Sequence, residues 1–158
     1  MPVAATTTQE LDPVLEFLRT IWALNHALER TSVRMETALG ITAQQRFVIR
    51  LIGRLPGVTP GALAELLHVD RGSITAVLKR LEARALIRRT PDPEDRRRVS
   101  LALTARGRKL NVPSCISVEH AVELALAQSP ASDVAAVRRL AHRLIAALDQ
   151  VVDSAEQG

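Results

Sequence analysis

The spacing of apolar residues changes near the middle of the sequence, and this change constrains the fold more than any other feature. Apolar residues recur every three or four positions in residues 60–67 and again in 71–84, as they do on one face of an α-helix. Residues 86–90 and 98–103 instead have the character of β-strands. The pattern therefore predicts two short helices followed by a β-hairpin.

The two short helices are expected to form a helix-turn-helix. Thr59 is suited to cap the first helix and Asp70 the second, which leaves residues 68–69 for a tight turn. Two short helices joined in this way, the second with small and polar residues on its outer face, are typical of DNA-binding units. The loop at 91–97 is rich in arginine and proline, so the hairpin would form a wing.

Long helical patterns flank this middle region. Residues 13–40 repeat apolar positions at helical spacing, with Asp12 suited to the N-cap and Gly40 to the end. A helix of roughly 28 residues far exceeds the average of about 11, so a partner along its length is expected. Helical patterns resume after the second strand. Pro113 predicts a break within 111–117, because proline removes a backbone donor and clashes with the preceding turn.

Charge is concentrated in the same middle region. The chain of 158 residues has a net charge of +4, but residues 41–110 carry +9 and the remainder carries −5. A basic middle region between acidic ends indicates that the middle region binds a polyanion and that the flanking segments have a different function. A solvated, arginine-rich surface is the alternative explanation of the same charge.

Composition excludes several classes of protein. Cys115 is the one cysteine and the four histidines are scattered, so neither a disulfide nor a zinc site is expected, and no cofactor is predicted. No apolar run approaches the roughly 18 residues of a membrane span. Residues 1–10 lack the features of a signal peptide and are expected to be a disordered tail.

The sequence contains neither a glycine-rich phosphate loop nor a nucleophile motif, so an enzyme is not expected. The sequence predicts a cytoplasmic protein with no membrane partner.

Three stretches carry a family resemblance: LGITAQQRFVIRLI, GALAELLHVDRGSITAVLKRLEARALIRR and DPEDRRRVSLALTARGRKL. They resemble the MarR family of bacterial transcriptional regulators, and DPEDRRR followed by LALTARG is the most specific part. The resemblance implies a mainly α protein of the α+β class. Its winged helix-turn-helix domain would occupy residues 41–110, and its helical dimerisation region residues 11–40 and 111–158. The implied function is a homodimeric regulator, a repressor rather than an activator, on a pseudo-palindromic operator.

The resemblance also assigns tasks to individual residues. The second helix of the helix-turn-helix would enter the major groove of double-stranded DNA, where arginine and lysine suit guanine edges while serine and threonine reach phosphate. The wing would place arginines in the adjacent minor groove, with Asp95 orienting one of them. For Arg88 and Arg89, a phosphate contact and a solvated strand position are both open. The residues expected to contact DNA are Arg71, Ser73, Thr75, Ala76, Lys79, Arg96, Arg97 and Arg98.

Many members of the family release DNA when a small, often aromatic, anionic ligand binds. A further helix is expected between 13–40 and the helix-turn-helix, capped by Thr42 and ended by Gly53. Trp22 and His26 on the helix at 13–40 and Arg46 on this further helix could supply stacking and charge for such an effector, whereas core or interface packing is the alternative for this tryptophan. Cys115 could instead sense oxidants, although a single thiol among apolar neighbours is commonly inert. A helical scaffold that binds no DNA is a third interpretation.

Two positions depart from the family pattern. Ala85 follows the recognition helix where the family usually has glycine, so a left-handed turn there would cost energy. Pro113 interrupts what the family builds as one long helix into the dimer interface. The resemblance therefore leaves open how the dimer interface is built and how it connects to the wing.

Overall fold

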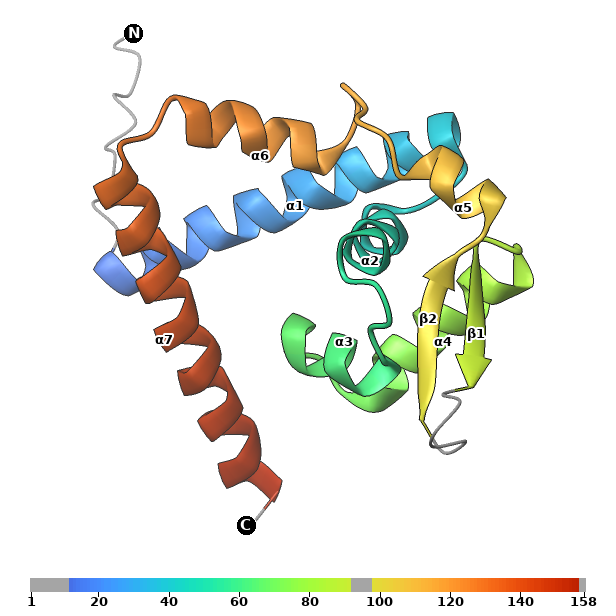
Figure 1. Ribbon diagram of the computed structural model, residues 1–158. Helices are drawn as coiled ribbons and strands as arrows, with labels where there is room; N and C mark the ends of the chain where they lie inside the picture. The colour runs from blue at the N-terminus through green and yellow to red at the C-terminus, as the bar shows by residue number, and fades with distance from the viewer. Residues whose placement is uncertain (1–11, 92–97, 157–158) are drawn as a thin grey trace, which may run out of the picture. The chain divides into compact units, whose positions relative to one another are not determined.

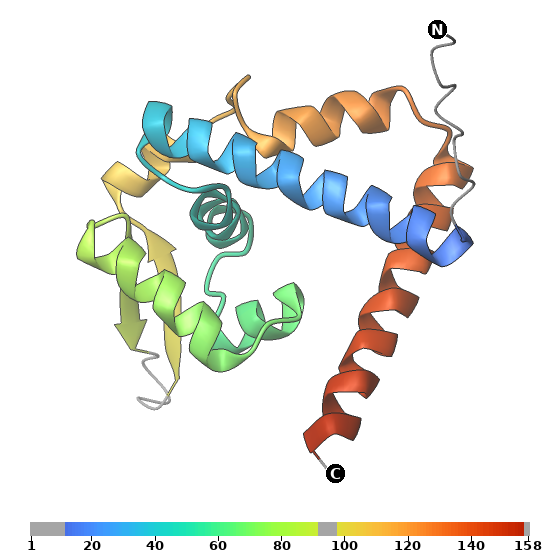
Figure 2. The same cartoon turned by 180° about the vertical axis from the view of Figure 1, so that it is seen from behind.

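The structure, a computed structural model, describes residues 12–91 and 98–156 (Figures 1 and 2). This part of the chain is mainly helical with a two-stranded sheet, as the sequence predicts. It divides into two compact units, of which the first ends at Val118 and the second begins at Glu119. The elements are α1 (Pro13–Leu39), α2 (Ala43–Arg54), α3 (Pro60–Leu67), α4 (Arg71–Ala83), β1 (Ile87–Pro91), β2 (Val99–Leu103), α5 (Ala105–Leu110), α6 (Val118–Ala127) and α7 (Ala131–Glu156).

Polar side chains cap the first helices at the positions that the sequence indicates. Asp12 accepts a hydrogen bond from the N–H of Val14 at 2.7 Å, and α1 ends at Gly40 in a left-handed conformation. Thr42 forms a reciprocal capping box at the start of α2. Thr59 caps α3 and Asp70 caps α4. These predictions of helix ends are confirmed.

The hairpin is antiparallel, with Ile87 opposite Leu103 and Pro91 opposite Val99. The predicted strands are present, but each begins one residue later than expected. Pro91, expected in the loop, is instead the last residue of β1. A proline is tolerated there because both strands of this sheet are edge strands, where a missing ladder donor costs little.

An aliphatic core holds the hairpin against the helix-turn-helix. It joins buried residues of α2, α3, α4 and both strands, among them Ile49, Leu63, Leu78 and Leu101. Each buried side chain of this size contributes about 1.5–3 kcal/mol. The buried cluster contains no aromatic residue. The lobe formed by α2 to α5 and the hairpin is therefore a packed unit within a single chain.

Two non-glycine residues of the described chain adopt left-handed backbone conformations, one in the turn before α4 and one in the turn after it. His68, with φ 51°, ends α3, and Ala85, with φ 53°, follows α4. The left-handed turn expected at Ala85 is present although alanine pays of order 1 kcal/mol for it. The turn persists because the N–H of Leu86 bonds the carbonyl of Leu81 at 3.0 Å and leads directly into the buried start of the hairpin.

Helix α5 begins where the hairpin returns to the end of α4. The hydroxyl of Thr104 donates to the carbonyl of Ala85 at 2.7 Å and accepts from the N–H of Gly107 at 3.0 Å. Gly107 is buried so close to the backbone that a Cβ there would lie 2.0 Å from the carbonyl oxygen of Leu86. The LALTARG motif therefore has a physical basis, because this junction requires both a hydroxyl cap and a glycine.

The helical break predicted around Pro113 is present. Helix α5 ends at Leu110 and α6 begins at Val118.

The two long helices, α1 and α7, are each described separately, and each exposes apolar side chains along most of its length. Met35 is the one buried residue of α1, and α7 has none among its described side chains. None of the described helices is both long and apolar enough to cross a membrane.

Candidate nucleic-acid interface

Helices α3 and α4 form the predicted helix-turn-helix. They pack against each other and are joined by residues 68–70 (Figure 1). The buried stripe of α4 faces the core, which leaves the opposite face of the helix in solvent. The residues of this stripe are Ile74, Val77, Leu78 and Leu81.

The outer face of α4 carries the helix residues that were expected to contact DNA. Four of them are exposed, and Thr75 is half-buried. Arg80 is also exposed and lies one turn beyond Ala76 on the same side, so its helical spacing identifies it although sequence reasoning passed over it. The four exposed expected residues are Arg71, Ser73, Ala76 and Lys79.

The cap of α4 determines what Ser73 can do. Asp70 accepts hydrogen bonds from both the hydroxyl and the N–H of Ser73, the latter at 2.8 Å. These bonds, the hydroxyl's first, hold the pKa of Asp70 below its ordinary value because they favour the ionised carboxylate. Since the hydroxyl proton is engaged, Ser73 faces solvent as an acceptor. That Ser73 contacts DNA stays a prediction.

A basic groove of about 360 Å³ lies beside the start of α3. Thr59 caps the N–H of Ala62 at 3.1 Å, and Pro60 has no N–H, so the N–H of Gly61 is the first donor of this helix without an intrahelical acceptor. A helix N-terminus beside guanidinium groups favours an anion such as a phosphate. The residues lining the groove are Thr59, Pro60, Gly61, Arg89, Arg98 and Val99.

The two arginines of this groove differ in what holds them. The Nε atom of Arg89 lies 2.9 Å from a carboxylate oxygen of Glu82, an ion pair that ties β1 to the end of α4. Arg98 is exposed just before β2. Arg88 points to the opposite face of the sheet from Arg89, as alternation requires, and lines a different groove. The remaining wing residues expected to act on DNA, Asp95, Arg96 and Arg97, lie outside the described residues.

The three residues expected to hold an effector are not alike. Trp22 and His26 lie one turn apart on exposed positions of α1, with Trp22 76% exposed. Arg46 is only 2% exposed, and its guanidinium donates to the carbonyl oxygens of Leu110 at 2.7 Å and Val112 at 2.6 Å. The expectation for Arg46 is thus corrected: its charge stabilises the end of α5 rather than standing open to a ligand.

Arg50 completes this attachment one turn along α2. It donates to the backbone oxygen of Asn111 at 2.9 Å and to the side-chain oxygen at 3.1 Å. Two arginines four residues apart therefore hold three consecutive residues, 110–112, at the end of α5. Cys115, further along the same segment, is exposed, and oxidant sensing by it stays a prediction. In residues 12–91 and 98–156 no group of three histidine, cysteine or acidic residues could hold a metal ion.

Sequence comparison places the same region in one family. The model of the MarR family matches residues 39–98, which include the helix-turn-helix and β1. The multiple antibiotic resistance protein MarR of Salmonella typhimurium is 32% identical over 102 residues, covering 65% of this chain and 71% of that protein. The chain belongs to the MarR family. Two further transcriptional regulators match over about half of their own length.

Solved MarR-like structures share the fold. FabT of Streptococcus pneumoniae, in complex with DNA, is 26% identical with a TM-score of 0.62, covering 87% of this chain and 96% of that one. PcaV of Streptomyces coelicolor, in complex with its natural ligand, is 26% identical with a TM-score of 0.66, covering 94% and 99%. The present MarR-family chain is accordingly a winged helix-turn-helix transcriptional regulator and not an enzyme, as the sequence predicts.

Proposed function

We propose that this protein is a homodimer that binds a pseudo-palindromic site in double-stranded DNA and represses transcription there. The observation that carries the proposal is the outer face of α4, where every fully exposed residue is either basic or small. A helix with this face can approach base edges closely while its arginines and lysine remain long enough to reach them. The likeness to FabT, which was crystallised with DNA, supports the same use of the fold.

Each side chain on this face suits a different contact. Arg71 and Lys79 can donate to the two acceptors of guanine in the major groove, and the methyl group of Ala76 can pack on the methyl group of thymine. Ser73, as an acceptor, fits an amino group of adenine or cytosine. Thr75 is half-buried and has the shortest reach of the set. Sequence preference should therefore depend on Arg71 and Lys79 first.

Phosphate contacts would come from the groove at the start of α3. A phosphate seated there would meet the N–H of Gly61 and the guanidinium of Arg98. The Glu82 pair limits Arg89 to a positioning task, because its charge is already matched. Beyond the described residues, Arg96 and Arg97 would enter the adjacent minor groove, with Asp95 orienting one of them.

Dimerisation is supported by the apolar side chains of the long helices. Helix α1 alone is about 40 Å long and exposes large apolar side chains that include Phe17 and Trp22. Helix α7 exposes Leu140, Leu148 and Val151. Apolar patches of this extent commonly mark protein interfaces. A second copy of the chain, covering these faces, would bring two copies of α4 to the two halves of a palindromic site.

Release of the DNA by a small ligand belongs to the same proposal. The likeness to PcaV, which was crystallised with its natural ligand, supports it. On the exposed side of α1, Trp22 and His26 offer an aromatic face and an imidazole one turn apart. An effector that changes the dimer contacts of α1 would alter the distance between the two recognition helices.

The salt dependence of DNA binding tests this function. With about three phosphate contacts from each half-site, the slope of log affinity against log salt should be near −5. Lys79→Ala should lower affinity for a bound genomic fragment roughly tenfold or more. Arg106→Ala, on exposed α5 beyond the other end of the hairpin, is the matched control and should change it little. A slope near zero, or equal losses in both variants, would contradict the proposed interface.

A further inference from the structure

Helix α4 contains a single acidic residue, Glu82, although the exposed residues of this helix are all basic or small. Glu82 lies in the last turn of the helix, where the Nε atom of Arg89 donates to its carboxylate at 2.9 Å. The side chains of Arg89 and Glu82 are 34% and 31% exposed, so the pair is partly covered between α4 and β1. An ion pair with this much exposure adds little to the stability of a fold, so stability alone does not account for an acid at this place.

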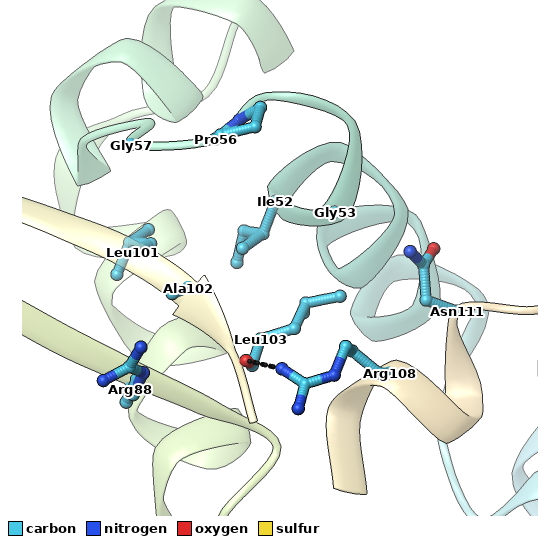
Figure 3. A pocket seen from close by; sticks show the side chains of 10 residues that line it. All are labelled: Ile52, Gly53, Pro56, Gly57, Arg88, Leu101, Ala102, Leu103, Arg108 and Asn111. Carbon is cyan, nitrogen blue, oxygen red and sulfur yellow. Dashed lines mark hydrogen bonds between the residues drawn. The ribbon is translucent and has the colours of Figure 1, made fainter. Parts of the chain in front are cut away.

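The register of the hairpin explains why Arg89 meets this carboxylate. Arg89 is opposite Leu101 in the antiparallel ladder, so the two side chains share a face of the sheet, and Leu101 is buried in the core that α4 also joins. The neighbouring Arg88 is opposite Ala102 on the other face, in the groove between α2, the hairpin and α5 that Figure 3 shows. None of the ten residues labelled in that groove is acidic. Of two consecutive arginines, the fold therefore places a carboxylate beside Arg89.

Arg89 also lines the groove at the start of α3, together with Gly61 and Arg98. In the proposed function this groove receives a phosphate of the DNA backbone. Phosphate and carboxylate groups both pair with a guanidinium through charge-assisted hydrogen bonds, so they would compete for Arg89. Glu82 already accepts from the Nε atom of Arg89, and its negative charge repels a second anion nearby.

We propose that Glu82 is a positioning residue that holds Arg89 back from the DNA backbone and thereby lowers the affinity for DNA. The inference rests on the proposed function, because it concerns the same phosphate-binding groove. A phosphate contact contributes to the binding of every sequence, since it carries no information about the bases. By holding one such contact back, Glu82 leaves a larger share of the binding free energy to the bases that α4 would read.

Removal of the negative charge should release the guanidinium. Glu82→Gln keeps the shape of the side chain, so each bound subunit should gain one phosphate contact. The slope of log affinity against log salt should become more negative by about 0.9 for each subunit, or from near −5 to near −7 for the two subunits of the proposed dimer. Affinity at moderate salt should rise roughly fivefold or more, equally for a bound genomic fragment and for random DNA.

Fluorescence anisotropy of the labelled fragment over a series of salt concentrations measures both the slope and the affinity. Thermal unfolding of Glu82→Gln should shift little, because an exposed pair contributes little to folding. An unchanged slope in this variant overturns the inference. Weaker binding by Glu82→Gln also overturns it, since the pair would then present Arg89 to the phosphate rather than hold it back.

Two further variants separate the action of Glu82 from a general effect of charge. Glu65→Gln removes the same charge from an exposed position of α3 that does not line the groove, and it should leave the slope unchanged. Glu82→Gln combined with Arg89→Gln removes both members of the pair and should return the slope and the affinity to the wild-type values. An equally steep slope in Glu65→Gln, or a gain that the double variant keeps, overturns the inference.

Lys79→Ala, measured on the same fragment, reports on the proposed function separately. A loss of affinity in this variant, together with no gain in Glu82→Gln, overturns the role of Glu82 and leaves the proposed interface standing. No loss in Lys79→Ala contradicts the interface itself, and with it the inference that depends on it.

Discussion

The winged lobe and the two long helices bury their apolar residues in opposite ways. In the lobe, α2 to α4 and the hairpin bury a continuous aliphatic cluster. Helix α1 has a single buried residue, Met35, and the described side chains of α7 include none. Since burial of apolar surface is the main favourable term in folding, the lobe is complete within one chain, whereas α1 and α7 are stabilised in full only when something covers them. The proposed DNA reading and the proposed assembly would therefore rest on different parts of the molecule.

The largest expected effect breaks the lobe. Gly107→Ala would place a Cβ against the carbonyl of Leu86, which is backbone and cannot move aside cheaply. We expect a loss of about 3 kcal/mol or more in the free energy of unfolding. Urea unfolding followed by circular dichroism measures it. Gly61→Ala, where a Cβ meets nothing closer than 4.0 Å, is the control and should cost little. Similar losses at the two glycines would show that the close packing at Gly107 is unimportant.

The next effect separates assembly from folding of the lobe. Leu148→Glu on α7 would place a charge within the proposed interface, and burying an unpaired charge is costly. We expect the dissociation constant of the dimer to rise roughly hundredfold or more while the lobe stays folded. Analytical ultracentrifugation over a range of protein concentrations measures this constant. Gln150→Glu adds the same charge two residues away and should leave the dimer intact. An unchanged dimer in the Leu148 variant would remove α7 from the interface.

A smaller effect concerns DNA alone. Arg98→Ala removes the exposed arginine of the α3 groove and should weaken DNA binding by about 1–3 kcal/mol with no change in the dimer. Fluorescence anisotropy with a bound fragment at fixed salt measures the loss. Because a phosphate contact carries no sequence information, the loss should be similar for specific and random DNA. A loss confined to one sequence would instead make Arg98 a base-reading residue.

The smallest effect is a gain. Ala85 has φ 53°, a conformation that glycine adopts without strain, so Ala85→Gly should raise the stability of the lobe by up to about 1 kcal/mol. Ala83→Gly, in the last turn of α4, should lower it by a similar amount because glycine weakens a helix. Thermal unfolding of the two variants should therefore shift in opposite directions. Shifts of the same sign would show that the turn at Ala85 carries no strain.

Local rules predicted most of the fold. Asp12, Thr59 and Asp70 cap the helices that the sequence indicated, because a capping side chain bonds to N–H groups only two or three residues away. The break after α5 followed from Pro113 for the same local reason. The exposed face of α4 followed from the spacing of its apolar residues.

Contacts distant in sequence could not be predicted in the same way. Arg46 was expected to meet a ligand, but its partners are carbonyl groups 64 and 66 residues away. The pair between Arg89 and Glu82, and the close approach of Gly107 to Leu86, likewise depend on how the hairpin folds back on α4. Such contacts are set by tertiary packing, which no local pattern of residue types encodes.

The proposal that two copies of the chain read one DNA site is tested most directly by selecting genomic DNA with the purified full-length protein and sequencing the bound fragments. The account predicts enrichment of inverted repeats whose half-sites lie about one DNA turn apart, roughly 34–36 Å. No enriched sequence, or enrichment of a single half-site without its inverted copy, would contradict it.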